Sequence, residues 1–281
     1  MKLSVIVPAY HDPFLLKTVE SLLKSAAGEL EILVVLDGEQ TPLPDDKRVK
    51  VLYCAKPRGM REAVNEGLRT ASGEYIMKCD SHCLFGEGFD KIMIENCSDD
   101  WLMIPRRYYL DEENWIRNTT RNYCDYSYLA FPAKTISFGC GLWAQPWIKS
   151  SPKETDDTMG LQASCWLANR KYFMSHIGLL DTKHYGEFAG DQLEIGLKYW
   201  LTGGANKVIK KTWYAHLTKA RHHYLNKTFR REYKVTRETA RCHTWAAKHW
   251  INNEEPNLVH PFSWIIEKFW PVPTWTVDWQ E

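Results

Sequence analysis

The residues with the clearest capacity for chemistry are Asp80, Ser81 and His82, which follow an apolar run that begins at Tyr75. An acid and an imidazole two residues apart, at the end of a strand, can both turn toward one metal ion. Mixed carboxylate and imidazole ligands suit Mn²⁺ better than Mg²⁺, which prefers oxygen ligands and water. In a nucleotide-binding architecture, such an ion would hold a pyrophosphate.

Two other interpretations of this short motif remain open. Asp80 to His82 can form a turn that caps a helix. Cys79, His82 and Cys83 can form part of a zinc site, although no second Cys/His pair of suitable spacing lies near them. The eight cysteines show no paired spacing, so we expect free thiols in a reducing compartment.

The elements that must position this motif are buried strands alternating with amphipathic helices. Apolar runs predict strands at 3–8, 31–36, 49–53 and 74–77, and helices at 12–28 and 58–71. This alternation predicts an α/β fold with a mostly parallel central sheet and helices on both faces. Ligands of such sheets bind beyond the carboxyl ends of the strands. We therefore expect one crevice lined by Pro8, Ala9, Tyr10, Asp37, Gly38 and the motif at Asp80 to His82.

The pattern is less regular after residue 100. Further strands are predicted at 101–105, 137–144, 163–168 and 207–213. Helices are predicted at 172–177 and 191–201, and a basic helix at 230–251. We expect two parts, a catalytic domain over 1–225 and a basic, tryptophan-rich helical extension over 226–281 packed on it.

Charge is distributed unevenly along the chain, although the net charge is only +1. The segment from Lys207 to Lys248 holds 12 Lys and Arg against two acids. Aromatic residues are interleaved with these cations, a mixture that suits phosphate contact and base stacking. The segment 207–249 therefore predicts an anionic partner such as DNA, or else a helix with a solvated basic face. The tail, with Trp264, Trp270, Trp275 and Trp279, either packs on the core or forms a partner-binding surface.

No stretch of the sequence reaches the roughly 18 apolar residues of a membrane span, and the short N-terminal apolar run is broken by Pro8. We therefore expect a cytoplasmic protein with no membrane partner.

Three stretches together resemble a known family. Ser4 to Tyr10, then Val34 to Gly38, then Gly73 to Ile76 before the acidic motif resemble glycosyltransferases of the GT-A type, including the broad family 2. The Asp-x-His motif, in place of the usual Asp-x-Asp, is similar to the polypeptide N-acetylgalactosaminyltransferases. The segment from Gly190 to Gly204 and the pattern from His216 to Tyr224 are similar to two further motifs of those enzymes.

This resemblance implies a UDP-sugar donor held through Mn²⁺ or another divalent cation, with Asp80, His82 and His216 as ligands. It implies that Arg221, His222 and Tyr224 contact the diphosphate. Lys219 would add fixed positive charge as UDP leaves. Asp37 is placed to bind uracil or ribose, and Arg58 or Arg61 to contact phosphate or ribose. Asp191 falls on the acceptor side, where it could orient the sugar or accept a proton. Gln192, the amide of the same segment, is a further catalytic candidate beside the pocket of the donor sugar.

The acceptor is less constrained than the donor. The basic segment favours 5-hydroxymethyl pyrimidines in DNA, as in bacteriophage genomes, with the base leaving the stack to react. The alternatives are a polysaccharide, glycolipid or protein acceptor, or an inactive nucleic-acid-binding protein on a transferase fold. Similarity to the N-acetylgalactosaminyltransferases favours retention of anomeric configuration, and inversion with Asp191 as base is the alternative.

Overall fold

A computed structural model describes residues 1–38, 40–131, 136–143, 151–188, 190–218 and 235–279, with the backbone alone at 235–238. Its strands are β1 Lys2–Ala9, β2 Glu29–Asp37, β3 Val49–Cys54, β4 Tyr75–Cys79, β5 Cys83–Phe85, β6 Trp101–Asp111, β7 Ile116–Asn118, β8 Ser127–Ala130, β9 Gly139–Leu142, β10 Thr155–Asp157, β11 Cys165–Asn169 and β12 Ala205–His216. Its helices are α1 Leu15–Ser25, α2 Met60–Thr70, α3 Phe89–Glu95, α5 Arg170–His176, α6 Thr182–Tyr185, α7 Asp191–Leu201, α9 Val235–Ile251 and α10 Phe262–Phe269.

One large sheet carries the site, with the strand order β10-β12-β6-β11-β4-β1-β2-β3. Strands β3, β2, β1 and β4 pair in parallel, and β6 pairs in parallel with β12. β11 lies antiparallel between β4 and β6, so those two strands also run in the same direction. The predicted α/β fold with a mostly parallel central sheet is confirmed.

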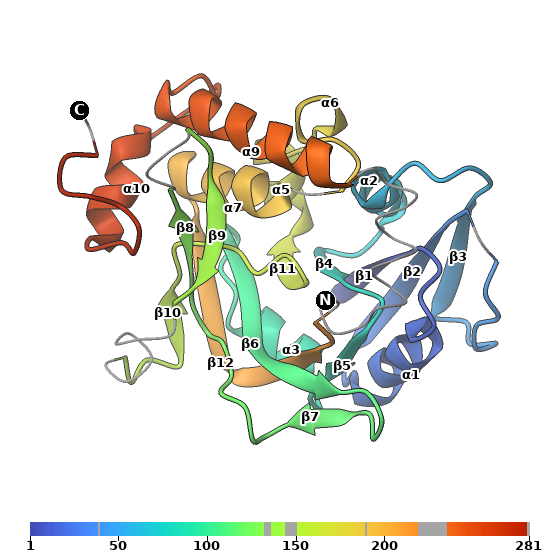
Figure 1. The fold of residues 1–281 in the computed structure, drawn as a ribbon. Coiled ribbons are helices and arrows are strands. Elements are labelled where there is room, and N and C mark those ends of the chain that lie inside the picture. The colour runs from blue at the N-terminus through green and yellow to red at the C-terminus, as the bar shows by residue number, and fades with distance from the viewer. Residues whose placement is uncertain (39, 132–135, 144–150, 189, 219–234, 280–281) are drawn as a thin grey trace.

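Helices cover both faces of this sheet (Figure 1). α1 and α3 bury Leu22 and Phe89 in the apolar cluster on one face. α2, α5 and α7 bury Leu68, Phe173 and Ile195 in the cluster on the other face. β1 is buried along both faces, which explains its continuous apolar run rather than an alternating one.

The C-terminal helices α9 and α10 lie outside α7 and bury a third apolar cluster with it (Figure 1). Trp250 and Ile265 are completely buried there. In the tail, Trp275 stacks on Phe131 with ring centroids 4.9 Å apart, whereas Trp270 is exposed. Trp264 and Trp279 are half-buried against the same cluster, so three of the four tryptophans of the tail pack on the core, as the first of the two interpretations predicts.

Several boundaries differ from the prediction. The first helix begins at Leu15 rather than Asp12, because the Asp12 carboxylate accepts the backbone N–H of Phe14 in a turn before the helix. The last strand runs on to His216, because pairing with β6 continues past an irregularity after Ile209. The sequence analysis did not predict α3, α10 or the short strands β5, β7, β8 and β10.

Candidate active site

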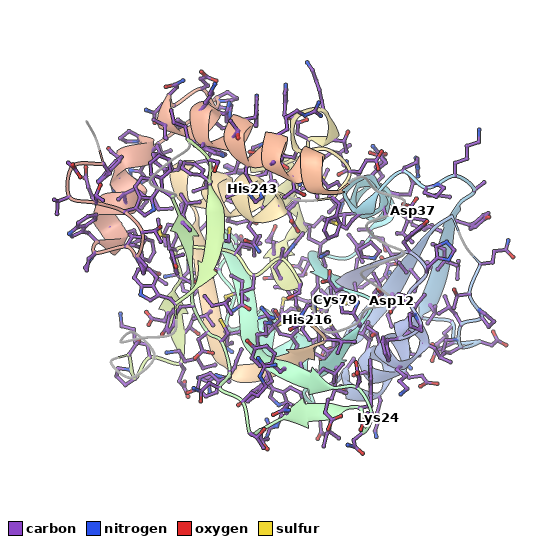
Figure 2. All side chains as sticks on the ribbon, in the orientation of Figure 1. Asp12, Lys24, Asp37, Cys79, His216 and His243 are labelled. Atoms are coloured by element: carbon purple, nitrogen blue, oxygen red, sulfur yellow. The ribbon has the colours of Figure 1, made fainter. Side chains whose placement is uncertain are left out.

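A cavity of about 450 Å³ opens at the carboxyl edge of the parallel strands. Pro8, Ala9 and Tyr10 reach it from the end of β1, and Asp37 from the end of β2. The structure thus brings the expected strand ends together with Asp80, Ser81 and His82. Figure 2 labels Asp37, His216 and His243, which approach the cavity from β2, β12 and α9.

Three possible metal ligands converge at the edge of this cavity. Ligand atoms of Asp80, His82 and His216 all lie within 4.8 Å of one another. The Nε2 atoms of the two imidazoles are 3.1 Å apart, and Asp80 Oδ2 is 3.1 Å from His216 Nε2. Two imidazole nitrogens and one carboxylate oxygen directed at a common point are a suitable donor set for Mn²⁺. The residues present fit the predicted ion.

The orientation of His82 is fixed by a second carboxylate. Asp12 Oδ2 lies 2.7 Å from His82 Nδ1 and accepts a hydrogen bond from Ser81 Oγ at 2.6 Å. A proton on Nδ1 leaves the Nε2 lone pair free for a ligand, which is the usual arrangement at metal-binding histidines. His216 Nδ1 is buried and has no hydrogen-bond partner among the described residues.

The surroundings of His216 and Asp80 favour the unprotonated forms of these side chains, which are the forms that can bind a metal ion. Burial lowers the pKa of His216 to about 3, so its imidazole is neutral at ordinary pH. Burial acts to raise the pKa of Asp80, but the attraction of Lys78 and a hydrogen bond with His216 outweigh it and hold that pKa well below its usual value.

Asp191 and Gln192 face the cavity from the first turn of α7. The preceding residue, Gly190, has φ +78°, and a Cβ there would lie 2.3 Å from Tyr185 Cδ1. Only glycine fits this close approach, which sets the direction in which the helix presents Asp191. Burial raises the pKa of Asp191, although the cations Lys78 and Arg61 oppose this change.

The profile of Glycosyl transferase family 2 matches residues 4–176. The chain belongs to this family. It is 30% identical to "Glycosyltransferase GlyG" of Streptococcus pneumoniae serotype 4 over 123 residues, which is 40% of this chain and 41% of that protein. It is 26% identical to "Polypeptide N-acetylgalactosaminyltransferase 9" of Macaca fascicularis over 190 residues, which is 63% of this chain and 29% of that protein. The chain thus spans less than half the length of either relative.

A crystal structure of GalNAc-T7 with UDP, GalNAc and Mn²⁺ has a similar fold, with a TM-score of 0.61 at 17% identity. The match covers 77% of this family 2 chain and 43% of that chain. The GT-A fold predicted from the sequence is confirmed. None of the helices in the described part of the chain is long and apolar enough to cross a bilayer.

Asp37 and the two arginines behave differently from the prediction. The Asp37 oxygens accept the backbone N–H groups of Arg58 and Gly59, each at 2.8 Å, so Asp37 also holds the loop before α2. Neither Arg58 nor Arg61, which the sequence predicts as donor contacts, is among the described residues that line the cavity. Arg61 is completely buried in an ion pair with Glu194, and the Arg58 side chain turns to Cys54. Gly38, with φ +100°, packs against Pro57 rather than lining the cavity.

The zinc interpretation of Cys79, His82 and Cys83 is also wrong. Both cysteines are completely buried in the apolar cluster under α1, whereas His82 turns to Asp12 and His216. Burial raises the pKa of both thiols well above the usual value, which disfavours the thiolate that zinc requires.

Lys219, Arg221, His222 and Tyr224 lie outside the described residues, as does the whole middle part of the basic segment, 219–234. Within the described part of that segment, Lys207 pairs with Asp157, and Lys211 pairs with Glu154 at 2.8 Å. Part of the positive charge that is apparent in the sequence is therefore neutralised by β10 and the residues before it.

The site also contains residues that were not predicted from the sequence, among them Asp12, Lys78, Cys140, Phe188 and His243. Cys140, Phe188 and His243 line the cavity from β9, the loop before α7, and α9, and nothing in their sequence contexts indicates this position. Asp12 was interpreted only as a helix start. Lys78 could have been found, because a lysine interrupts the apolar run of a central strand.

Proposed function

We propose that this family 2 protein transfers a sugar from a UDP-sugar to a hydroxyl group, with Mn²⁺ held by Asp80, His82 and His216. The observation that carries the proposal is the convergence of these ligands beside a cavity at the carboxyl edge of the sheet. The similar structure of GalNAc-T7 contains UDP, GalNAc and Mn²⁺, which supports the choice of donor and ion.

The cavity divides into regions with different chemistry. Pro8 to Tyr10 and Asp37 form the end that suits a uridine, because carboxylate and backbone groups can pair with its polar edge. Asp191 and Gln192 form the end that suits the sugar, because both side chains can hydrogen-bond hydroxyl groups. The ligand cluster lies where the diphosphate would join these two ends.

A bound divalent ion would neutralise the negative charge that develops on the diphosphate as UDP leaves. The residues of the chain prepare its site: Asp12 orients His82, burial keeps His216 neutral, and Asp80 is ionised because its pKa lies well below the usual value. We propose that Asp191 orients the sugar or accepts a proton from the acceptor. Lys219, Arg221, His222 and Tyr224 stay predicted contacts of the leaving diphosphate.

A second cavity of about 240 Å³ adjoins the first and shares Asp80, His216 and Gln192 with it. Arg107, Ser127 and Gln162 give it a polar lining. An acceptor hydroxyl must approach the anomeric carbon beside the diphosphate, so we assign this second cavity to the acceptor.

For the acceptor itself, we propose DNA that carries 5-hydroxymethyl pyrimidines. The proposal is supported by the positive charge of the segment 207–249. The ion pairs of Lys207 and Lys211 with acids of the same protein reduce that charge. The test is to offer the protein five acceptors with a UDP-sugar and to measure the mass of each product. The acceptors are duplex DNA with these bases, duplex DNA without them, a polysaccharide, a glycolipid and a peptide. Mass gain on one of the last three, with none on modified DNA, rules out the DNA acceptor.

The test of the function itself is UDP release with a panel of UDP-sugars, with and without Mn²⁺. His82→Ala and His216→Ala should each abolish Mn²⁺-dependent release. His176→Ala is the matched control, because His176 lies on the exposed side of α5. Full activity in either ligand variant would remove that residue from the proposed site. We expect retention, which the anomeric proton coupling of the product reports.

A further inference from the structure

Lys78 lies in the middle of the sheet, where lysine is rare. It belongs to β4, whose five residues are all buried, and its own exposed fraction is 2%. Burying an ammonium group is costly unless it is paired and hydrogen-bonded. A lysine in this position therefore needs specific partners.

The partners of Lys78 belong to the candidate active site. Its Nζ donates hydrogen bonds to Asp80 Oδ1 at 2.6 Å and to the Ala163 carbonyl at 2.7 Å. Asp80 and Lys78 lie two residues apart, so their side chains leave the same face of the strand. The other carboxylate oxygen, Oδ2, lies 3.1 Å from His216 Nε2 on the side of the ligand cluster. Lys78 therefore uses one oxygen of Asp80 and leaves the other for a metal ion.

The ammonium retains one hydrogen-bond donor beyond these contacts. A lysine has three N–H donors, and two of them are used by Asp80 and Ala163. Among the described residues no third acceptor is present, and Lys78 lines the cavity. The remaining donor is available to a ligand in that cavity.

The charges of the cavity lining make the position of Lys78 important for binding an anionic ligand. The described acids that line the cavity are Asp37, Asp80 and Asp191, and Lys78 is the sole Lys or Arg among its described lining residues. The diphosphate of a UDP-sugar carries a negative charge on each phosphate. It would enter a cavity rich in carboxylates, where repulsion is strong because burial weakens solvent screening.

We propose that Lys78 is a donor-binding residue whose fixed positive charge balances the diphosphate of the UDP-sugar beside the metal site. This inference rests on the proposed function. It assigns Lys78 a role separate from that of the ion ligands, because an ammonium repels a divalent cation and attracts the diphosphate.

The experiment compares Lys78→Met with the wild-type protein for three ligands: Mn²⁺ alone, uridine alone, and UDP with Mn²⁺. We expect UDP to bind about tenfold more weakly or worse, which corresponds to about 1.4 kcal/mol or more. Uridine should bind unchanged because it carries no charge. Mn²⁺ alone should bind equally well or more tightly, because a nearby positive charge has been removed.

Two further variants make the result decisive. Lys78→Arg keeps the charge and should keep UDP affinity within about threefold. Lys50→Met is the matched control, because Lys50 also lies on a strand and donates to an acid, Glu31, at 2.7 Å, but does not line the cavity. It should bind all three ligands as the wild-type protein does.

Each adverse outcome has a defined meaning. Equal loss of uridine and UDP in Lys78→Met, or weaker binding of Mn²⁺ alone, would show a structural role and overturn the inference. Unchanged UDP affinity would overturn it as well, as would loss of UDP alone in Lys78→Arg. Failure of the wild-type protein to bind UDP with Mn²⁺ would instead reject the proposed function.

Discussion

Replacing Asp12 by asparagine tests whether the orientation of His82 matters for metal binding. Each carboxylate oxygen of Asp12 already has a donor opposite it: the Phe14 N–H at 3.0 Å from Oδ1, and His82 Nδ1 at 2.7 Å from Oδ2. An asparagine has one oxygen, so its NH₂ group must face one of these donors. If the NH₂ faces His82, Nδ1 must accept and the ring proton moves to Nε2, the atom that should bind the ion.

The size of the expected effect on metal binding follows from the loss of the hydrogen bond between His82 and Asp12. A hydrogen bond to a charged group contributes about 1.5–3 kcal/mol. Loss of a carboxylate behind a metal-binding histidine typically weakens metal affinity about 10- to 100-fold, which is the same range in free energy. We therefore expect Asp12→Asn to weaken Mn²⁺ binding by about 10- to 100-fold at neutral pH.

The assay is a titration with Mn²⁺ followed by electron paramagnetic resonance of the free ion. The matched control is Asp46→Asn, because Asp46 Oδ1 also accepts a backbone N–H two residues later, from Arg48 at 2.9 Å. Asp46 has no contact with an imidazole among the described residues, so its variant should bind Mn²⁺ normally. Equal Mn²⁺ affinity in the two variants would refute the assigned role of Asp12.

Three further substitutions test the packing and the electrostatics of the fold. Arg61→Met should lower the free energy of unfolding by about 3 kcal/mol, because the buried Glu194 then keeps only Lys198, 3.5 Å away, as a cation among the described residues. Arg61→Met with Glu194→Met should recover part of this loss in denaturant titrations. Burial acts to raise the pKa of Glu31, but hydrogen bonds from a lysine and two serines hold that pKa well below its usual value. Glu31 therefore stabilises the fold at pH values above the pKa that its carboxyl group has in the unfolded chain. The stability difference between Glu31→Gln and wild type should therefore shrink as the pH falls from about 5 to 3, and a difference that grows would contradict this assignment. Gly190→Ala should lower both the melting temperature and UDP release, because the added Cβ would overlap Tyr185, and an unchanged protein would show that α7 can shift freely.

The sequence predicts well where the ends of the parallel strands meet, for a physical reason. Buried parallel strands give continuous apolar runs, and the polar residues that follow them, such as Asp37 and Asp80, must meet at one edge of the sheet. The helix Asp191–Leu201 is predicted at the bounds that the structure shows, because its apolar period and the flanking glycines agree.

Side-chain direction is what the pattern does not specify. Arg61 lies on the helix that follows Asp37, yet it points inward to Glu194, a partner 133 positions away along the chain. Cys140 and His243 enter the cavity from β9 and α9 by tertiary packing, which leaves no periodic signal in the sequence. The position of Asp12 beside His82 depends on a tertiary contact that its own neighbours in sequence do not reveal, whereas Lys78 is visible as a lysine within an apolar strand.

His216, the third proposed metal ligand, shows how strand register, rather than local sequence, completes the ligand cluster. His216 pairs with Cys83 in the antiparallel contact between β12 and β5, and the next backbone N–H, from Leu217, bonds to the His82 carbonyl at 3.2 Å. This pairing brings the two imidazoles together although they are 134 positions apart in the chain. Because side chains alternate along a strand, a slip of one residue would turn His216 to the opposite face of the sheet and remove a ligand. The irregularity in the pairing of β12 with β6 after Ile209 therefore helps to build the proposed metal site, since the register beyond it places His216 opposite Tyr109.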